Sequence, residues 1–272
     1  MKFALCNEMF ENRPMSEICS IAQRLGYHGI EIAPFTISTS AKNISPGQRN
    51  EIRKIIEGHG LETVGLHWLF AVPEGLHITT TDDRIRRNSR DYLNVLIDLC
   101  HDLGGKVMVI GSPKQRSLMP GQTAEGAWQR AVDLFVAVLD KAHESNVTLC
   151  IEPLAPAETD FINTVSEGMK MVRQIDHPNF KINLDVKAMS SEAIPVAEVI
   201  RSVRAEDIGH FHVNDTNFYG PGMGNVDYSP IAEAVKDIGW DKWVSVEVFK
   251  YDPDPETIAR KSIEYLKSFW HS

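Results

Sequence analysis

Apolar and polar positions along the chain follow two different periods. Eight short runs, rich in branched and aromatic apolar residues, have the length and composition of buried β-strands. These runs cover residues 3–6, 29–33, 63–67, 106–110, 147–152, 181–185, 209–213 and 243–248. Between them lie longer segments whose apolar residues recur every three to four positions, which is the period of an amphipathic helix. The pattern therefore predicts eight strands that alternate with helices.

Several of the expected helices carry recognisable start signals. Ser16 is placed to cap the first helix. Thr164 and Glu167 have the spacing of a capping box. Ser229-Pro230 and Asp254-Pro255 each place a capping residue before a proline at the first helical position. These signals indicate that helices, rather than long loops, connect the predicted strands.

This alternation predicts a single-domain (β/α)8 TIM barrel that covers residues 1–272. The chain has 272 residues, 43% of them hydrophobic, and such a barrel needs about 250 residues. An open, doubly wound sheet is the architectural alternative. A dinucleotide-binding sheet would need a GxGxxG motif after its first strand, and no such motif follows the first run here. The closed barrel is therefore favoured.

Composition limits the partners of this fold. The net charge is −9 and no stretch is strongly basic, so the chain has little with which to neutralise a phosphate backbone. We expect no nucleic-acid partner and favour a small polar substrate. The start of the chain carries one lysine and a short apolar run, and no apolar stretch approaches the length that a bilayer requires. We therefore expect neither export nor a membrane anchor.

The cysteines suggest a reducing compartment. All 4 lie within apolar periodic segments and none shows a CxxC spacing, which favours buried thiols over a disulfide framework or a zinc knot. These residues are Cys6, Cys19, Cys100 and Cys150. We accordingly expect a cytoplasmic protein.

Four apolar runs in the second half of the chain end at or near residues that bind divalent metals. These residues are Glu152, Asp185, His212 and Glu247. Their spacing is close to one βα unit at each step, so strands five to eight would each present one ligand at the carboxyl-end mouth of the barrel. Three carboxylates and one imidazole suit Mn²⁺, Mg²⁺ or Co²⁺ better than a structural zinc site, which prefers thiolates and more imidazoles.

Taken singly, an acid at a strand end is usually a helix cap or a solvated loop residue. The joint pattern favours a metal site instead. Glu152 and Glu247 lie in apolar strands, where an unpaired carboxylate would cost several kcal/mol unless a cation compensates it. We expect one divalent ion per chain, with Mn²⁺ as the first candidate and Mg²⁺ or Co²⁺ as the others.

Five motifs resemble those of the xylose isomerase-like barrels. The resemblance is strongest to the sugar phosphate isomerase/epimerase group, which includes D-tagatose 3-epimerase, hydroxypyruvate isomerase and inosose dehydratase. It covers the whole chain from GYHGIEI at 26–32 onward, and as a set the motifs are specific to the superfamily rather than to one substrate. The motifs are IEPL at 151–154, NLDVKAM at 183–189, GHFHVND at 209–215, GPGMGNVDY at 220–228 and VSVEVF at 244–249.

The resemblance implies a reaction. In the family pattern, the metal ligands fall on Glu152, Asp185, His212 and Glu247. The metal holds a carbonyl and a neighbouring hydroxyl of a ketose or keto-sugar and stabilises the enediolate that forms when the adjacent carbon loses a proton. In the epimerases, two glutamates on opposite faces of that carbon remove and return the proton, and these correspond to Glu152 and Glu247. Relatives are commonly dimers or tetramers, which implies a homo-oligomer.

Two positions depart from the tagatose epimerase pattern. Members of that type carry a substrate-contacting histidine three residues after the metal aspartate and an arginine six residues after the metal histidine. Here these positions are Ala188 and Phe218. A metal-dependent lyase or dehydratase that acts on an inosose or a 3-keto-glycoside is therefore an alternative, because the same enolate can lose a leaving group. A non-catalytic sugar-binding barrel is a second alternative, although the retained glutamates argue against it.

The fold's DNA-repair relatives of the endonuclease IV type fit less well. They need a trinuclear zinc cluster with several more histidines at strand ends, and a basic surface. Of the 10 histidines in this chain, only His67, His210 and His212 lie at predicted strand ends, and the net charge has the wrong sign. His210 shares its strand face with His212, so it could support the metal ligand.

Basic residues near the mouth could replace the missing substrate contacts. Lys187 lies two residues after Asp185, so strand alternation would bring its ammonium to a developing oxyanion. The run GSPKQR at 111–116 offers Lys114 and Arg116 to a carboxylate or phosphate of the substrate. A solvated basic side chain is the simpler interpretation of each.

Other substrate contacts are predicted at the ends of strands three, five and seven. His67 can hydrogen-bond a sugar hydroxyl and Trp68 can cover an apolar sugar face, although a tryptophan that only packs is the competing account. Glu158 matches a substrate-contacting glutamate of the epimerase relatives, and Asn214 lies on a mouth loop. Ordinary loop polarity is the simpler account of these last two.

Overall fold

Each of the eight apolar runs forms a strand, and the strands pair in chain order into a closed parallel barrel. The computed structural model describes residues 1–270. Every observed strand boundary lies within two residues of the predicted one. The strands are β1 (Lys2–Cys6), β2 (Gly29–Ile32), β3 (Glu62–Leu66), β4 (Val107–Ile110), β5 (Thr148–Ile151), β6 (Phe180–Asp185), β7 (Ile208–Val213) and β8 (Trp243–Val246).

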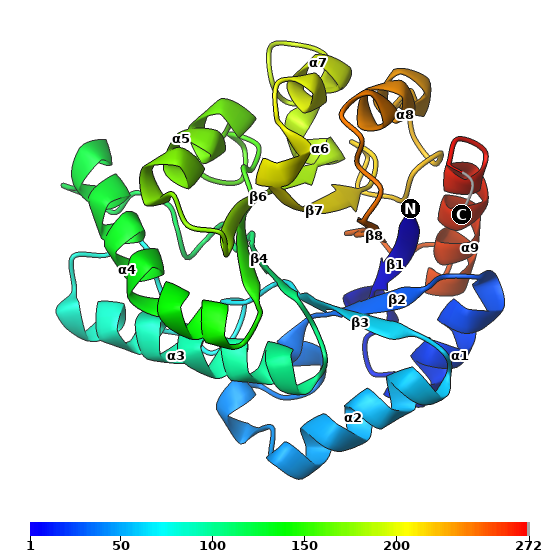
Figure 1. Ribbon diagram of the computed structural model, residues 1–272, viewed down its shortest axis with the longest axis horizontal. Coiled ribbons are helices and arrows are strands. Elements are labelled where there is room, and N and C mark those ends of the chain that lie inside the picture. The colour runs from blue at the N-terminus through cyan, green and yellow to red at the C-terminus, as the bar shows by residue number, and fades with distance from the viewer. Residues whose placement is uncertain (271–272) are drawn as a thin grey trace.

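Helices form a ring around this barrel (Figure 1). The longer ones are α1 (Met15–Leu25), α2 (Pro46–Gly58), α3 (Asp83–Asp102), α4 (Ala124–Glu144), α5 (Val165–Ile175), α8 (Tyr228–Asp237) and α9 (Pro255–Lys267). The shorter ones are α6 (Val186–Met189) and α7 (Val196–Arg201), with 3₁₀ turns η1 (Asn7–Phe10), η2 (Pro34–Thr36), η3 (Ala41–Asn43) and η4 (Ala205–Asp207). The (β/α)8 architecture predicted from the sequence is therefore confirmed for residues 1–270.

Two of the predicted helix starts are confirmed. Thr164 and Glu167 form the expected capping box at the start of α5. Asp254 caps α9 by accepting a hydrogen bond from the backbone N–H of Thr257 at 2.8 Å, with Pro255 at the first helical position.

The other two predicted starts are wrong. Ser16 lies inside the first turn of α1, because the carbonyl of Pro14 already accepts the first backbone hydrogen bonds of that helix. At α8 the cap is Asp227, whose carboxylate accepts from the N–H of Ser229 at 2.9 Å, so that helix starts two residues earlier than expected. In both cases an upstream residue with suitable backbone geometry starts the helix first.

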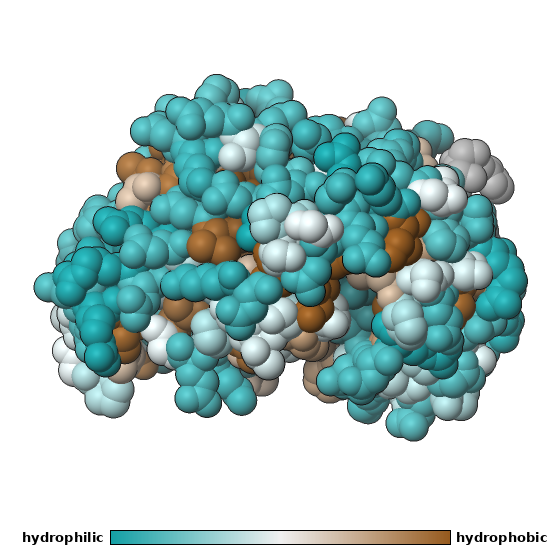
Figure 2. All heavy atoms as spheres, turned by 90° about the horizontal axis from the view of Figure 1, so that it is seen from below, coloured by the Kyte–Doolittle hydropathy of each residue, from teal (hydrophilic) through white to brown (hydrophobic). Residues whose placement is uncertain are grey.

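The apolar faces of the strands and helices form one continuous core between the barrel wall and the helix ring. All four cysteines are free and buried, as the sequence suggested. Within residues 1–270, no helix is long and apolar enough to cross a membrane. On the face seen in Figure 2, the surface is mostly hydrophilic and apolar side chains form separate patches between polar ones.

Candidate active site

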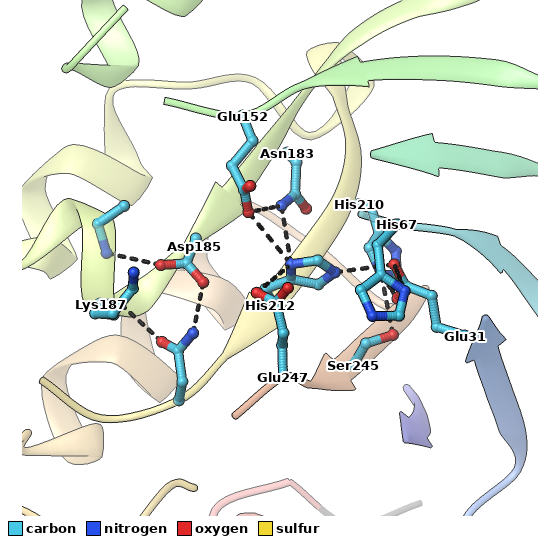
Figure 3. A network of polar contacts seen from close by, with 12 residues as sticks. Glu31, His67, Glu152, Asn183, Asp185, Lys187, His210, His212, Ser245 and Glu247 are labelled. Carbon is cyan, nitrogen blue, oxygen red and sulfur yellow. Dashed lines mark hydrogen bonds and ion pairs between the residues drawn. The ribbon is translucent and has the colours of Figure 1, made fainter. Parts of the chain in front are cut away.

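The four predicted metal ligands converge at the carboxyl-end mouth of the barrel (Figure 3). Glu152 directly follows β5, Asp185 ends β6, His212 lies in β7 and Glu247 directly follows β8. All four side chains are buried, and one ligand atom from each lies within 4.8 Å of the others. The structure thus brings together four residues that are far apart in the sequence.

The charges in this cluster fit a cation. Nδ1 of His212 lies 3.3 Å from Oε1 of Glu152 and 3.2 Å from Oε2 of Glu247. Burial, together with the charge of Glu152, raises the pKa of Asp185 to about 7. Three carboxylates and one imidazole in a buried space form the oxygen-rich donor set that Mn²⁺, Mg²⁺ and Co²⁺ bind, and a divalent ion would offset the repulsion between the carboxylates. The residues therefore fit a divalent metal.

Asp185 has two further roles in the structure. Its Oδ1 accepts from the backbone N–H of Ala188 at 2.7 Å and caps α6, while its Oδ2 accepts from Nδ2 of Asn214 at 2.6 Å. Asn214 is fully buried, and its amide oxygen accepts from the backbone N–H of Lys187 at 2.8 Å. Asn214 thus holds the Asp185 carboxylate in this structure, and its substrate contact stays a prediction.

Two residues that the sequence analysis missed position Glu152. Nδ2 of Asn183 donates to Oε1 of Glu152 at 2.8 Å. Gly111, which follows β4, gives the same carboxylate room, since a Cβ at this position would collide with Oε2 of Glu152. Asn183 could have been found by strand alternation, because it lies two residues before Asp185 and points to the same side of β6.

A small cavity opens beside the cluster. Four of the predicted substrate contacts line this cavity, together with Glu152, Asp185 and Glu247; the four are His67, Trp68, Glu158 and Lys187. Two others do not. Lys114 is exposed on its loop, away from the cavity lining. The side chain of Arg116 is fully buried and donates from Nη1 to the carbonyl of Glu152 at 2.6 Å and from Nη2 to the carbonyl of Ile110. Its substrate contact stays a prediction, and these bonds favour a structural role.

Lys187 brings a positive charge to the cavity. Its Nζ donates to Oε1 of Glu158 at 2.8 Å and lies 4.4 Å from the ring centroid of Phe249. Burial alone would lower the pKa of Lys187, but the carboxylates of Asp185 and Glu158 outweigh it and raise the pKa above its usual value. The side chain is 7% exposed, so this ammonium is a buried, charged donor beside the metal-ligand cluster.

One wall of the cavity is aromatic and extends toward the surface. Trp68 and Phe249 line the cavity, and the rings of Phe35, Trp68, Phe249 and Phe218 meet edge to face in that order, with centroids 6.4, 6.2 and 6.2 Å apart. Trp68 has a φ of 52° and Phe218 a φ of 75°, a backbone region that costs a bulky residue about 1 kcal/mol or more. Strained residues of this kind often lie at ligand sites. Among residues 1–270, the buried Nε1 of Trp68 has no hydrogen-bond partner.

A second polar cluster lies beside His212, to the right of its ring in Figure 3 and on the side away from Glu152 and Asp185. Its centre is Glu31 in β2, whose carboxylate lies 3.0 Å from Nε2 of His212, 2.7 Å from Nε2 of His210 and 3.7 Å from Nδ1 of His67. Burial would raise the pKa of Glu31, but His210 and His212 hold it well below its usual value. Glu31 is therefore an internal carboxylate in contact with a candidate metal ligand.

His67 connects this inner cluster to η1. Its Nε2 lies 2.6 Å from Oε2 of Glu8, which is also buried. Burial would lower the pKa of His67, but Glu8 outweighs it and raises the pKa to about 8. Neither Glu8 nor Glu31 was predicted from the sequence as a site residue. The available signal for Glu31 was a charged residue in the middle of the apolar run GIEI.

Known proteins resemble this chain in sequence and in fold. Residues 19–269 match the model of the family described as xylose isomerase-like TIM barrel. The D-psicose 3-epimerase of Ruminiclostridium cellulolyticum is 29% identical over 230 residues, which cover 83% of this chain and 75% of that protein. A crystal structure of D-psicose 3-epimerase in the presence of D-fructose superposes with a TM-score of 0.87 at 21% identity and covers 99% of both chains. The apo 3-keto-D-glucoside 4-epimerase of Escherichia coli gives a TM-score of 0.85 at 20% identity, covering 98% of this chain and 99% of that one.

Proposed function

The chain belongs to the xylose isomerase-like TIM barrel family, and from this membership we propose that it is a divalent-metal-dependent epimerase or isomerase of a ketose or keto-sugar. Its named relatives are sugar epimerases, so it is an enzyme of the sugar isomerase/epimerase kind. The observation that carries the proposal is the buried cluster of Glu152, Asp185, His212 and Glu247 at the mouth of the barrel.

The four residues of the cluster would hold one divalent ion, and their donor set makes Mn²⁺ the first candidate, with Mg²⁺ and Co²⁺ next. When bound, such an ion supplies a Lewis acid that polarises the carbonyl of the sugar. Asn214 and the N-terminus of α6 hold the Asp185 carboxylate, and Asn183 holds that of Glu152. The oxygen ligands are thus oriented by neighbouring residues before any substrate arrives.

Glu152 and Glu247 are the proposed proton carriers. They follow β5 and β8, which lie on different sides of the barrel mouth, and both line the cavity. A sugar carbon placed between them can lose its proton to one carboxylate and receive a proton from the other on the opposite face. Epimerisation needs this arrangement, because one face of the carbon loses a proton and the opposite face must receive one.

Lys187 and Glu158 are proposed to bind the sugar beside the reacting carbon. The ammonium can donate to a hydroxyl or to the developing oxyanion, and the carboxylate can accept from a hydroxyl. His67 and Trp68 complete the lining, with the unpaired indole N–H of Trp68 available to a substrate oxygen. These contacts would replace the histidine and arginine that Ala188 and Phe218 displace.

A second candidate function is a metal-dependent lyase or dehydratase that acts on an inosose or a 3-keto-glycoside. The aromatic wall favours a glycoside, since Trp68, Phe249 and Phe218 offer an apolar surface to an aglycone on the side where tagatose epimerase-like members have a polar contact. The same proton abstraction would then be followed by loss of a β-leaving group.

One experiment separates these functions. The Mn²⁺-loaded protein is incubated in D₂O with D-psicose, D-tagatose, L-ribulose and a 3-keto-glucoside, and the products are followed by NMR and mass spectrometry. We expect one deuterium in an epimerised or isomerised product. Deuterium with loss of water or aglycone would support the lyase instead. Metal-dependent sugar binding without exchange in the whole panel would contradict both and leave a non-catalytic barrel. Glu144→Gln, at an exposed position of α4, is the control for Glu152→Gln and Glu247→Gln.

A further inference from the structure

Glu31 is a fully buried carboxylate that has no part in the proposed proton transfer. It lies in β2, on the opposite half of the barrel from the strands that carry the metal-ligand cluster. A buried carboxylate without partners would cost several kcal/mol, so its contacts indicate what it does. Those contacts are imidazoles: His212 and His210 from β7 and, at a longer distance, His67 after β3.

The contact with His212 selects one tautomer of that ring. Oε1 of Glu31 lies 3.0 Å from Nε2 of His212. An ionised carboxylate can only accept hydrogen bonds, so Nε2 must carry the proton. Nδ1 faces Glu152 at 3.3 Å and Glu247 at 3.2 Å, so by the same rule it offers a lone pair only when a divalent ion engages those two carboxylates, while Nε2 keeps its proton toward Glu31. The ring therefore turns Nδ1 toward the place where the carboxylates meet and a divalent ion would lie.

The Glu31 carboxylate is itself held in place. Its Oε2 lies 2.7 Å from Nε2 of His210, and Oγ of Ser245 in β8 lies 3.0 Å from the same nitrogen. Each carboxylate oxygen thus has its own imidazole partner from β7. Rotation of the carboxylate away from His212 would also break the contact with His210.

We propose that Glu31 is a positioning residue that fixes the tautomer and the orientation of His212, so that Nδ1 is free to bind the metal. The inference rests on the metal site of the proposed function, but it does not depend on which sugar reacts. A carboxylate behind a metal-binding histidine raises the basicity of the ligand, and loss of such a partner typically weakens metal binding 10- to 100-fold.

The test measures metal binding as well as turnover. Glu31→Gln keeps the shape of the side chain, but its amide can accept from only one of the two imidazoles. We expect the dissociation constant for Mn²⁺, measured by isothermal titration calorimetry, to rise about 10- to 100-fold in Glu31→Gln. The matched control is Ser245→Ala, which removes a buried hydroxyl from His210 without touching the Glu31–His212 contact. We expect the Ser245→Ala dissociation constant to stay within about threefold of the wild-type value, well short of the loss from a removed histidine partner.

A second measurement uses the unmodified protein, so it does not depend on how a variant folds. In the Mg²⁺-loaded protein labelled with ¹⁵N, long-range ¹H–¹⁵N spectra should show the proton of His212 on Nε2. A proton on Nδ1 would overturn the proposal. The proposal would also be overturned if Glu31→Gln kept the wild-type Mn²⁺ dissociation constant and only lowered the melting temperature of the metal-free protein. That result would mean that Glu31 stabilises the fold without affecting the metal ligand.

The two proposals fail in different ways. A protein that binds Mn²⁺ with the expected dependence on Glu31, but exchanges no deuterium into any sugar, supports the positioning role and contradicts the proposed enzyme function. A protein that binds neither Mn²⁺ nor Mg²⁺ contradicts both.

Discussion

Replacement of Arg116 tests whether this side chain stabilises the fold or binds the substrate. The guanidinium is fully buried and donates to the carbonyls of Glu152 and Ile110, at the ends of two adjacent strands. Each of these charge-assisted bonds contributes about 1.5–3 kcal/mol, so Arg116→Met loses about 3–6 kcal/mol. Burial lowers the pKa of Arg116 from its usual value to about 10, and removal of the buried charge returns about 3 kcal/mol of that cost. The expected net loss is up to about 3 kcal/mol.

For a chain of this length, that loss corresponds to a melting temperature lower by about 6 °C. Differential scanning calorimetry of the metal-free protein measures it without reference to any substrate. Arg116→Lys can still donate to one carbonyl and should lose about half as much. Lys114→Met, on the exposed part of the same loop, is the control and should melt within about 1 °C of the wild type, as surface changes usually do. An unchanged melting temperature in Arg116→Met, combined with a KM for the sugar raised tenfold or more, would refute the reasoning and restore the substrate contact predicted from the sequence.

Four further results are expected. Glu152→Gln or Glu247→Gln should lower kcat by at least about 100-fold while the melting temperature changes little, as measured by deuterium exchange and calorimetry; full activity in either would contradict its role as a proton carrier. The pKa of Asp185 is about 7, so the metal-free protein holds a proton on this carboxylate at lower pH, and Mn²⁺ must displace it. The affinity for Mn²⁺ should therefore fall by up to about tenfold for each pH unit below 7. Titration calorimetry at pH 6 and pH 8 tests this. Gly111→Ala should weaken Mn²⁺ binding because the added methyl group displaces the Glu152 carboxylate, and equal affinity would show that the carboxylate has room to move. Lys187→Met should lower kcat/KM for the sugar by about 100-fold with little change in Mn²⁺ affinity, whereas loss of metal binding would place the ammonium in the metal site instead.

The fold and the metal-ligand cluster could be predicted because both follow from local patterns. Apolar runs of strand length recur at intervals of one βα unit, and a barrel places the carboxyl ends of its strands at one mouth. Glu152, Asp185, His212 and Glu247 therefore had to lie close together if the barrel closed. The capping signals were less reliable, since Pro14 and Asp227 compete with the serines that follow them.

The supporting residues could not be predicted with the same rules. Glu31 and Asn183 are single polar residues inside apolar strands, and only the closed barrel brings them to His212 and Glu152. The fate of Arg116 depends on how its loop folds back beneath the strand ends, and residue type does not reveal this. Sequence patterns thus predicted which four candidate ligands lie together, while the contacts that orient them required the three-dimensional structure.

The contact between Glu31 and His212 joins side chains 181 residues apart in the chain. The C-terminal half contains all four candidate metal ligands, but the carboxylate behind His212 comes from the N-terminal half. High-affinity metal binding would therefore report closure of the whole ring during folding. If the chain were expressed as two fragments divided between α4 and β5, we expect the C-terminal fragment to bind Mn²⁺ weakly and to gain affinity when the N-terminal fragment is added. The metal could then serve as a spectroscopic probe of how the two halves of the barrel assemble.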